Sequence, residues 1–250
     1  MTKNCKFCNR LFLPGYKKQI FCSLKCANRF NLNNKNKINL PLEPTQELAE
    51  LFSILLGDGS VTRYYTKIYL NPIADAGYSI FVKNLCKLIF PEIVVSRYPM
   101  THRGTEDLQL SSTDVSSFLI KLGFNPKTRA VPQWIKNNNN FTKAAIRGLI
   151  DTEGCMGIKY FRGVRGNYFY KQLTFTNRSK NLLTFVETGL RRFGYKPTKP
   201  TKKFNKNIYV SNAADISRYF KEIGSHNPKL IKKYEMITIG EFRYGGLAER

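Results

Sequence analysis

The sequence predicts an α+β fold built from two similar units, each with the element order α-β-β-α-β-β-α, preceded by a small module. A helical segment that ends in an acidic residue occurs twice, at residues 45–59 and 142–154. The same succession of strand and helix patterns follows each copy, which indicates an internal repeat. Four cysteines at the spacing of metal ligands stand near the N-terminus. The predicted boundaries are 1–30 for the metal-binding module, 31–44 for an Asn-rich linker, 45–136 for the first unit, 137–141 for a polar connector, 142–235 for the second unit and 236–250 for a tail.

The two acidic helices have matched ends and matched small residues. Thr45 and Thr142 are expected N-caps, and Gly59 and Gly154 are expected C-caps. With the copies aligned at their acidic residues, small side chains recur at every fourth position: Ala49, Ser53 and Gly57 in the first copy, and Ala144, Gly148 and Thr152 in the second. Because such a stripe lets two helix backbones approach closely, the helices are predicted to pack on each other.

Asp58 and Glu153 are the acidic residues, and each stands just before the last glycine of its helix. The negative end of the helix dipole disfavours a carboxylate there, so stability alone does not select it. If the small stripes pair, the two carboxylates meet and need a shared proton or a divalent cation. A cation between paired acids is a common device for hydrolysing phosphodiesters. The alternative is that Asp-Gly and Glu-Gly are ordinary helix-to-loop turns; two matching copies favour the paired site.

The segments LFSILLGDG (51–59) and IRGLIDTEG (146–154) resemble the motif that names the LAGLIDADG homing endonucleases. The second copy matches well, whereas the first has Ser53 in place of the early glycine and Leu56 in place of the first aspartate. The resemblance covers roughly residues 45–235. It implies a saddle-shaped antiparallel sheet in each unit, a pseudo-twofold axis between the two helices, and a monomeric enzyme, since both motifs lie in one chain.

The same resemblance implies the site chemistry. Asp58 and Glu153 would be the catalytic residues and would bind Mg2+ or Mn2+, with the backbone carbonyls of Gly57 and Thr152 completing the coordination. A basic residue is also expected near the metal. The candidates for it are Lys202, Lys203 and Arg97.

Hydrophobic patterning predicts the elements that follow each acidic helix. After Gly59 we expect a hairpin, a helix at 77–90, strands at 93–98 and 107–112, and a helix at 113–122. After Gly154 we expect strands at 155–162 and 170–177, a helix at 179–193, strands at 199–204 and 207–211, and a helix at 213–223.

The charge balance points to a polyanionic partner. Lys and Arg number 41 against 17 Asp and Glu, so the net charge is +24, which favours nucleic acid. The first residues do not resemble a signal peptide, and no run approaches the roughly 18 apolar residues of a membrane span. We therefore expect a soluble intracellular protein, in the cytoplasm, nucleoid or an organelle matrix, without membrane association.

Four of the six cysteines form a C-x2-C and C-x3-C pair of motifs: Cys5, Cys8, Cys22 and Cys26. Four thiolates at this spacing are typical of a structural zinc site in a zinc-ribbon or treble-clef module. The basic residues around it suggest an accessory contact to DNA, and the alternative is a metal-stabilised fold with no contact role. Cys86 and Cys155 are interpreted as buried packing residues.

Within the predicted strands, apolar side chains alternate with polar or basic ones, so one face of each sheet can pack while the other meets a partner. Such a face can lie in the major groove of double-stranded DNA. The two faces differ, which predicts an asymmetric target. Taken singly, a residue of this kind is more often a solvated surface charge than a base contact. The candidates are Arg63, Tyr65, Lys67, Tyr69, Arg97, Arg103, Gln109, Lys159, Arg162, Arg165, Lys171, Gln172, Lys202, Lys203 and Lys206.

These observations together predict a metal-dependent, site-specific endonuclease that cuts both strands of DNA. Two alternatives stay open on the same fold. One is a DNA-binding regulator without catalysis, and the other is a maturase that binds structured intron RNA.

Overall fold

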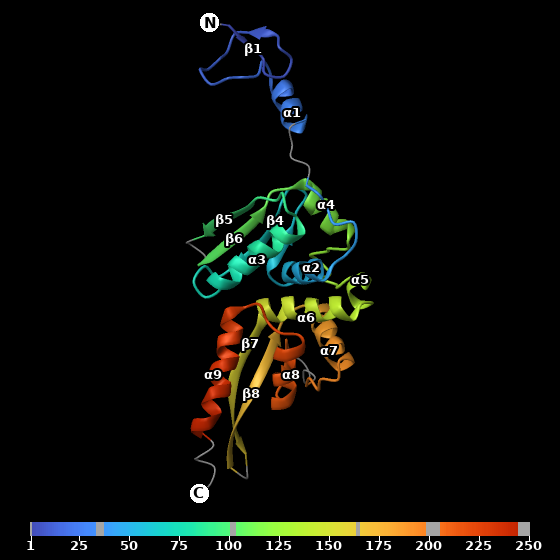
Figure 1. Ribbon diagram of the computed structural model, residues 1–250, viewed down its shortest axis with the longest axis vertical. Helices are drawn as coiled ribbons and strands as arrows, with labels where there is room; N and C mark the ends of the chain where they lie inside the picture. The colour runs from blue at the N-terminus through green and yellow to red at the C-terminus, as the bar shows by residue number, and fades with distance from the viewer. Residues whose placement is uncertain (1, 34–37, 101–103, 164–165, 199–205, 245–250) are drawn as a thin grey trace. The chain divides into compact units, whose positions relative to one another are not determined.

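The computed structural model describes residues 2–33, 38–100, 104–163, 166–198 and 206–244 of the 250-residue chain. The chain forms two compact units, Met1–Ile38 and Asn39–Arg250 (Figure 1). In the described part of the chain, no helix is both long and apolar enough to cross a lipid bilayer.

The N-terminal unit consists of a two-stranded ribbon and one helix. Strand β1 (Lys3–Asn4) pairs antiparallel with β2 (Leu11–Phe12), and helix α1 spans Leu24–Asn33. The hydroxyl of Ser23 accepts a hydrogen bond from the Cys26 backbone N–H and caps the start of α1. The helix runs past the boundary that we predicted at residue 30, and the unit ends at Ile38.

The first half of the larger unit follows the predicted element order. Its elements are α2 (Gln46–Asp58), β3 (Gly59–Val61), β4 (Thr66–Leu70), α3 (Ala76–Ile89), β5 (Val95–Met100), β6 (Thr105–Leu110) and α4 (Thr113–Lys121). The strands form an antiparallel sheet in the order β3-β4-β6-β5. Thr45 caps α2 as expected, because its side chain accepts from the Leu48 N–H.

The second half repeats this plan. Its elements are α6 (Asn139–Glu153), β7 (Gly154–Gly163), β8 (Gly166–Thr176), α7 (Lys180–Arg192), β9 (Asn207–Val210) and α8 (Ala213–Glu222). The strands pair antiparallel in the order β7-β8-β9. The strand predicted at 199–204 lies outside the described residues. The predicted α+β class with a repeated unit is confirmed.

Two helices were not predicted, and they change the boundaries of the second half. Helix α5 spans Gln133–Lys136, and α9 spans Pro228–Tyr244, so most of the predicted tail is helical. Pro228 suits the first turn of a helix, where no N–H partner is required. The predicted connector 137–141 is also wrong in part, because α6 already begins at Asn139.

The N-cap of α6 is Asn138 and not Thr142. The Asn138 side chain accepts from the N–H groups of Asn140 and Phe141. Thr142 is buried within the helix and its hydroxyl donates to the Ile135 carbonyl at 2.9 Å. Asparagine is as good an N-cap as threonine, so the apolar periodicity alone could not locate the start of this helix.

Helices α2 and α6 lie side by side between the two halves (Figure 1). A Cβ atom built on Gly148 would lie 2.7 Å from the Glu50 carbonyl oxygen, which no side chain can tolerate. A Cβ on Gly57 would lie 2.6 Å from Thr152 Oγ1. Nearly all of α2 is buried, from Leu48 to Gly57. The predicted pairing of the small-residue stripes is therefore confirmed.

Candidate functional site

The C-terminal ends of α2 and α6 bring the two acidic residues together. Gly59 and Gly154 end the helices in extended conformations, so the chain leaves each helix directly as a strand. A Cβ atom added to Gly57 would lie 3.6 Å from Glu153 Cγ, which places the end of α2 against the acid of α6. Asp58 and Glu153 are both half-buried.

Burial and mutual repulsion disfavour negative charge on this pair. The pKa of Asp58 is raised from 3.8 to about 7, first by burial and then by the charges of Glu153 and Asp75. Burial also raises the pKa of Glu153, against the opposing effects of Arg129 and Asn177. A bound divalent cation would strongly stabilise the ionised form of two such carboxylates, because it replaces the solvation lost on burial and cancels their repulsion.

Arg129 and Asn177 approach the acids, and neither was predicted from the sequence. The Arg129 guanidinium donates to the Gly57 carbonyl at 3.5 Å and lowers the pKa of both acids by its charge. Asn177 is buried and donates through Nδ2 to Glu153 Oε1 at 2.9 Å. Asn177 is the last residue of the strand predicted at 170–177, and this position at a strand end is the sequence signal that could have identified it. Nothing in the sequence indicates that Arg129, from the loop after α4, reaches α2.

The donor set at the helix ends fits a hard divalent cation. It comprises two carboxylates and the adjacent backbone carbonyls, which are the oxygen ligands that Mg2+, Mn2+ and Ca2+ accept. The Gly57 carbonyl is oriented toward the cationic Arg129, as the hydrogen bond shows. The assignment of Gly57 and Thr152 as carbonyl ligands stays a prediction.

The first sheet places part of the predicted contact set on one exposed face. Lys67 lies opposite Gln109 and Tyr69 opposite Asp107 in the β4–β6 register, so all four share a face. Lys67 is already paired with Asp107, with Nζ 3.0 Å from Oδ2. This ion pair fixes the lysine over the sheet, and it must loosen or be shared for Lys67 to bind a phosphate.

Arg97 lies on the opposite face of that sheet. It is opposite Leu108 in the β5–β6 register, and its guanidinium pairs with the buried carboxylate of Glu106 at 2.5 Å. Glu106 also accepts from Ser79 of α3, so this face packs on the helix. The geometry therefore argues against Arg97 both as a groove contact and as the basic residue near the metal.

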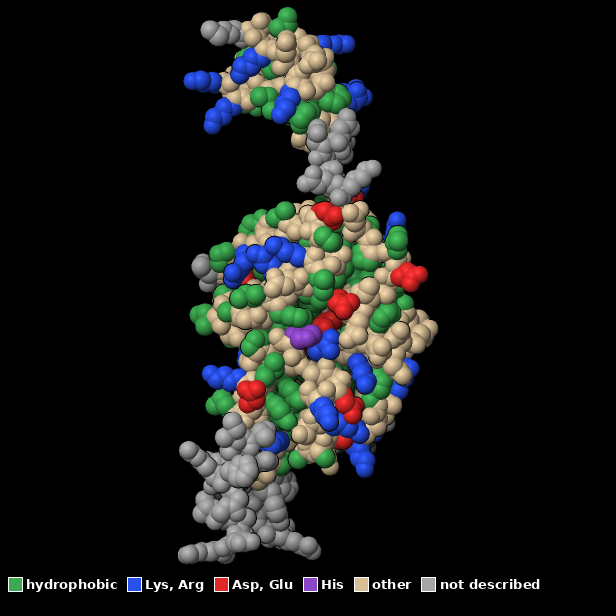
Figure 2. All heavy atoms as spheres, in the orientation of Figure 1, with side chains coloured by type: hydrophobic (Ala, Val, Ile, Leu, Met, Phe, Trp, Pro, Cys, Tyr) green, Lys and Arg blue, Asp and Glu red, His purple; other side chains and the backbone are tan. Residues whose placement is uncertain are grey.

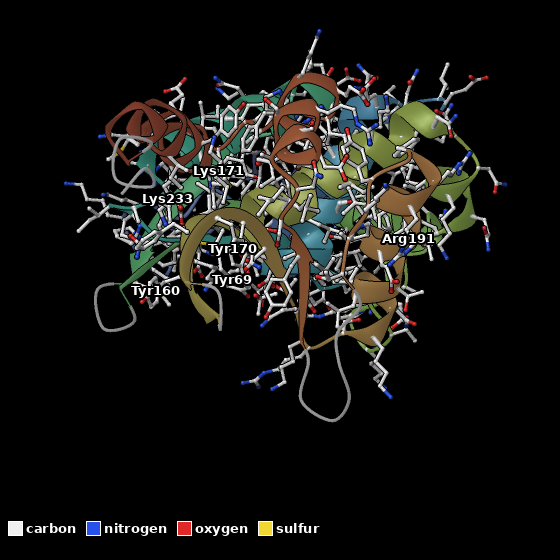
Figure 3. All side chains as sticks on the ribbon, turned by 90° about the horizontal axis from the view of Figure 1, so that it is seen from below. Tyr69, Tyr160, Tyr170, Lys171, Arg191 and Lys233 are labelled. Carbon is white, nitrogen blue, oxygen red and sulfur yellow. The ribbon has the colours of Figure 1, made fainter. Side chains whose placement is uncertain are left out.

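The second sheet also offers only some of its predicted contacts. Lys159 lies opposite Tyr170 across β7 and β8, and both are exposed. Gln172 is buried and donates to Ser211 at 3.1 Å, so it braces the sheet. Lys171 alternates with Gln172 and shares the face of Leu173. Figure 3 shows Tyr160, Tyr170 and Lys171 on this hairpin, and Tyr69 on the other sheet.

The remaining candidates are exposed or lie outside the described side chains. Arg63 and Lys206 are exposed, Tyr65 is partly exposed, and Arg63 lies over the Tyr64 ring. The side chains of Arg103, Arg162, Arg165, Lys202 and Lys203 are outside the described part of the structure. Figure 2 shows Lys and Arg side chains spread over both halves of the larger unit on the face that it displays.

Residues 140–224 match the family model described as a LAGLIDADG-like domain. Solved structures extend the likeness to both halves. The structure of I-DmoI in complex with DNA and Mn aligns with a TM-score of 0.52 at 15% identity, covering 72% of this chain and 96% of that chain. Both halves have the LAGLIDADG fold. The resemblance predicted from the two motifs is thus confirmed.

Two further solved structures align with this chain over both halves. I-AabMI bound to uncleaved DNA aligns with a TM-score of 0.52 at 15% identity, over 79% of this chain and 91% of that chain. Full-length DUF199/WhiA from Thermatoga maritima aligns equally well, with a TM-score of 0.52 at 17% identity over 80% of this chain and 62% of that chain. At these identities the likeness shows the fold alone.

Two curated relatives match parts of the chain. The ribonucleoside-diphosphate reductase NrdEB subunit alpha of Bacillus subtilis is 29% identical over 127 residues, which are 46% of this chain and 12% of the reductase subunit. An uncharacterized protein of Methanocaldococcus jannaschii is 25% identical over 175 residues, covering 68% of this chain and 62% of that protein. The chain therefore spans a small part of the reductase subunit and less than two thirds of the Methanocaldococcus protein.

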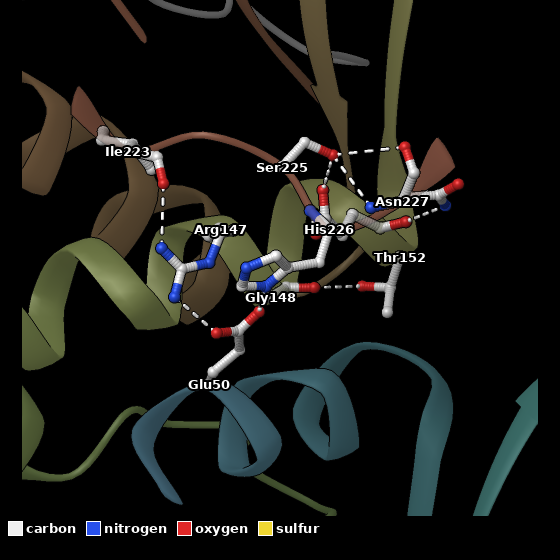
Figure 4. Close-up of polar contacts among 9 residues, drawn as sticks. Glu50, Arg147, Gly148, Thr152, Ile223, Ser225, His226 and Asn227 are labelled. Atoms are coloured by element: carbon white, nitrogen blue, oxygen red, sulfur yellow. Dashed lines mark hydrogen bonds and ion pairs between the residues drawn. The ribbon is translucent and has the colours of Figure 1, made fainter. Parts of the chain in front are cut away.

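A buried polar network joins the two LAGLIDADG helices to the loop before α9 (Figure 4). Glu50 of α2 accepts from Arg147 of α6 at 2.5 Å, and its other oxygen lies 2.7 Å from His226 Nδ1. Burial acts to raise the pKa of Glu50, but His226 and Arg147 outweigh it and hold the pKa below 4.5. Asp151 accepts from the Ser225 hydroxyl at 2.5 Å and from the His226 N–H at 2.7 Å.

The side chains of Glu50, Asp151 and His226 lie close enough together to be considered as metal ligands. Each of the two acids is already satisfied by protein donors, since Arg147 bonds Glu50 and two N–H or O–H groups bond Asp151. A cation there would have to displace a guanidinium. The cluster therefore acts as a brace between the two halves and does not resemble an ion site.

The four N-terminal cysteines form a metal-ligand cluster. The sulfur atoms of Cys5, Cys8, Cys22 and Cys26 lie within 4.8 Å of one another, with Cys8 3.6 Å from Cys22 and Cys22 3.5 Å from Cys26. Zinc in a tetrahedron of sulfurs at ~2.3 Å requires sulfur separations of about 3.8 Å, so the cluster fits that ion. Burial acts to raise the pKa of Cys5, but the N–H groups of Cys22, Cys8 and Phe7 outweigh it and bring the pKa to about 6.

The other two cysteines differ from each other. Cys86 is buried in α3, as predicted, and burial raises the pKa of its thiol to about 12. Cys155 is exposed on β7, so its interpretation as a buried residue is wrong. The alternation along β7 puts Met156 into the core and leaves its neighbour outside.

Proposed function

We propose that this protein is a divalent-metal-dependent endonuclease that cuts double-stranded DNA at a long asymmetric site. The observation that carries the proposal is the meeting of Asp58 and Glu153 at the ends of two packed helices, where burial raises the pKa of both acids and mutual repulsion adds to the shift at Asp58. Mg2+ or Mn2+ bound there would activate water for attack on a phosphodiester and stabilise the leaving oxygen. The net charge of +24 supports a polyanionic substrate.

The residues around the acids have distinct roles in this proposal. Asp58 and Glu153 would hold the metal, and the backbone carbonyls of Gly57 and Thr152 would be further oxygen ligands. Asn177 orients the Glu153 carboxylate through its Nδ2 donor. Arg129 supplies the positive charge next to the acids that the family resemblance led us to expect from Lys202, Lys203 or Arg97.

The exposed sheet faces would read the DNA. Lys67, Tyr69 and Gln109 on the first sheet and Lys159 on the second offer donors and aromatic surface. Because the two faces carry different side chains, the target would not be a palindrome. Both LAGLIDADG halves lie in one chain, and a monomer would therefore suffice.

The decisive experiment is selection of cleaved sequences from a randomised duplex library with Mg2+, Mn2+, Ca2+ or EDTA. Asp58→Asn and Glu153→Gln are the test variants, and Glu187→Gln, an acid of α7 paired with Arg191, is the matched control. Metal-dependent cuts that both test variants lose and the control keeps would support the proposal. Equal cutting by wild-type protein and both test variants would refute it.

A second candidate is a DNA-binding regulator without catalysis. The fold likeness does not separate it from the nuclease, since I-DmoI and DUF199/WhiA align with the same TM-score of 0.52. This candidate predicts sequence-specific DNA binding without cleavage in the presence of any of the metals.

Competition between duplex DNA and structured intron RNA at one salt concentration tests the maturase alternative in the same preparation.

The cysteine cluster would hold structural zinc. Four protein ligands leave no open coordination position, so this ion would stabilise the N-terminal unit and take no part in hydrolysis.

A further inference from the structure

A hollow of about 470 Å³ with a strongly basic lining lies between the loop after α4 and the start of α7. One lining residue, Arg129, is close enough to Asp58 and Glu153 for its charge to lower the pKa of both. Four of its seven lining residues carry a positive charge, and none is acidic: the cations are Lys127, Arg129, Arg178 and Lys180. In the described part of the chain, no carboxylate pairs with Lys127, Arg178 or Lys180, and all three are exposed.

Hydrogen bonds hold the walls of this hollow in place. Asn181 Nδ2 donates to the Thr128 carbonyl at 2.8 Å and ties α7 to the loop. Asn177 Oδ1 accepts from the Ser179 N–H at 2.8 Å, while its Nδ2 group bonds Glu153. One asparagine thus links the wall of the hollow to the candidate catalytic acid. Arg129, another lining residue, donates to the Gly57 carbonyl next to Asp58.

The pseudo-twofold counterpart of the hollow is built differently. Asn227 bonds the Lys229 N–H through Oδ1 in the same way that Asn125 bonds the Lys127 N–H, at 3.0 Å and 2.9 Å. Lys229 and Lys127 are therefore equivalent positions of the two halves. Lys229, however, faces an acid, since its Nζ lies 3.3 Å from Asp75 Oδ1 just before α3.

The two equivalent positions therefore differ in charge. At one of them a lysine is neutralised by an aspartate, in the Lys229–Asp75 ion pair. At the other, four cations line the hollow and no carboxylate does. Like charges so close together repel, and an anion between them relieves the repulsion. The lysine and arginine side chains offer the donors that a phosphate accepts.

We infer that the hollow between Lys127 and Lys180 binds a backbone phosphate of the DNA, close to the bond that is cut. The inference rests on the proposed interaction with DNA and specifies how that DNA is held. We call this site, lined by Lys127, Arg129, Arg178 and Lys180, the phosphate seat. Only one DNA strand would be bound in this way, because the equivalent lysine of the other half, Lys229, is paired with Asp75. The two strands would then be held unequally at the acids, and one would be nicked before the other.

Binding measurements test the seat independently of cleavage. Arg178→Gln with Lys180→Gln is the test variant, and Lys229→Gln is the matched control at the pseudo-equivalent position. The dissociation constant for a duplex is measured from 50 to 200 mM salt with Ca2+ in place of Mg2+. Each lost phosphate contact lowers the slope of log affinity against log salt by about 1. Over this fourfold range of salt, the loss of affinity then changes by about fourfold.

We expect the slope to fall by about 1 in the double variant and to stay unchanged in the control. Replacing single phosphates by neutral methylphosphonates locates the seat, since one position on one strand should weaken the wild-type protein and not the double variant. Inorganic phosphate at millimolar concentration, used as a competitor, distinguishes a site for free phosphate from a site that needs the DNA strand. Equal slopes for the double variant and the wild type would overturn the inference.

Cleavage kinetics separate this inference from the proposed function. End-labelled strands should show one strand cut first by the wild type, with that bias reduced in the double variant. A protein that never cuts but shows the slope change refutes the nuclease and retains the phosphate seat. A protein that cuts normally, with unchanged slope and bias in the double variant, refutes the seat and retains the nuclease.

Discussion

Asp58→Asn should stabilise the metal-free protein at neutral and alkaline pH. The pKa of Asp58 is about 7 in the folded protein against an ordinary value of 3.8, because burial and the charge of Glu153 disfavour the carboxylate. The folded state therefore binds this proton more tightly than the unfolded chain does. The free energy of unfolding should fall as pH rises from about 4 to about 7, and then stay level.

The magnitude follows from the difference between the two pKa values. A difference of about 3 pKa units at ~1.4 kcal/mol each gives about 4 kcal/mol as an upper limit for the charge penalty above pH 7. The carboxyl group is only half-buried, and water screens part of the interaction. We therefore expect Asp58→Asn to raise the free energy of unfolding at pH 8 by about 1–3 kcal/mol, with little effect at pH 4.

Urea unfolding with EDTA at pH 4, 6 and 8 measures this effect. Trp134, the only tryptophan, packs edge-on against Phe52 and Phe141 and reports on the larger unit. Added Mg2+, Mn2+ or Ca2+ should stabilise the wild type, by about 2.7 kcal/mol at 100 times the dissociation constant, and Asp58→Asn much less. Glu187→Gln should behave as the wild type.

One result would refute the reasoning. If Asp58→Asn is no more stable than the wild type at pH 8 without metal, and both gain equally when metal is added, then Asp58 carries no charge penalty. The two acids would then not share a cation site, and the nuclease proposal would lose its main support.

Three further predictions test the packing, the interhelical brace and the N-terminal unit. Gly148→Val should destabilise the larger unit by about 3 kcal/mol, because the added side chain meets the Glu50 backbone, which cannot move aside as a flexible side chain would. Gly157→Ala, where an added Cβ meets nothing within 4 Å, should leave the free energy of unfolding unchanged in the same urea titration. Glu50→Gln should cost about 3–5 kcal/mol at pH 7 by leaving Arg147 buried without a counter-charge, and less as pH falls below 4.5, where the lowered pKa of Glu50 is approached; a cost independent of pH would refute the ion-pair account. Zinc chelation or Cys22→Ser should unfold the N-terminal unit and leave the Trp134 transition unchanged, which circular dichroism and fluorescence separate; a shift of both transitions would show that the two units depend on each other.

The sequence predicted the parts of the fold that follow from periodicity and from repeated motifs. The stripe of Gly57, Ser53 and Ala49 required a close partner, and α6 supplies it. The Cys5 to Cys26 spacing predicted a cluster that the structure forms. In both cases the signal was local and was present in two or more copies.

The missed features depend on contacts between distant segments. Arg129 has a positive φ of 48° and reaches α2 across 72 positions of sequence, which no pattern in its own loop encodes. Arg97 satisfied the strand alternation, but the register with β6 turned it toward Glu106 and α3. A one-residue change of register moves a side chain to the other face of a sheet, so composition could not assign its face.

Leu56 and Asp151 occupy the same motif position, and the structure explains why one can be apolar. The Asp151 carboxylate accepts from Ser225 and His226, and its carbonyl accepts from Asn227, so this acid anchors the loop that leads into α9. It takes no part in the bonds around Glu153. Burial raises its pKa to about 7, which is a cost to stability at neutral pH that its hydrogen bonds offset.

In the first half the corresponding loop is held differently, because Arg129 donates to the Gly57 carbonyl of α2. Asn125 caps its own turn by accepting from the N–H groups of Lys127 and Thr128, and Leu56 is buried in the apolar core. Replacing a carboxylate by leucine at this position removes a loop contact and leaves the acid two residues later in place. The departure from the motif in the first copy therefore changes how one half is braced, while Asp58 keeps its position at the end of the helix beside Glu153.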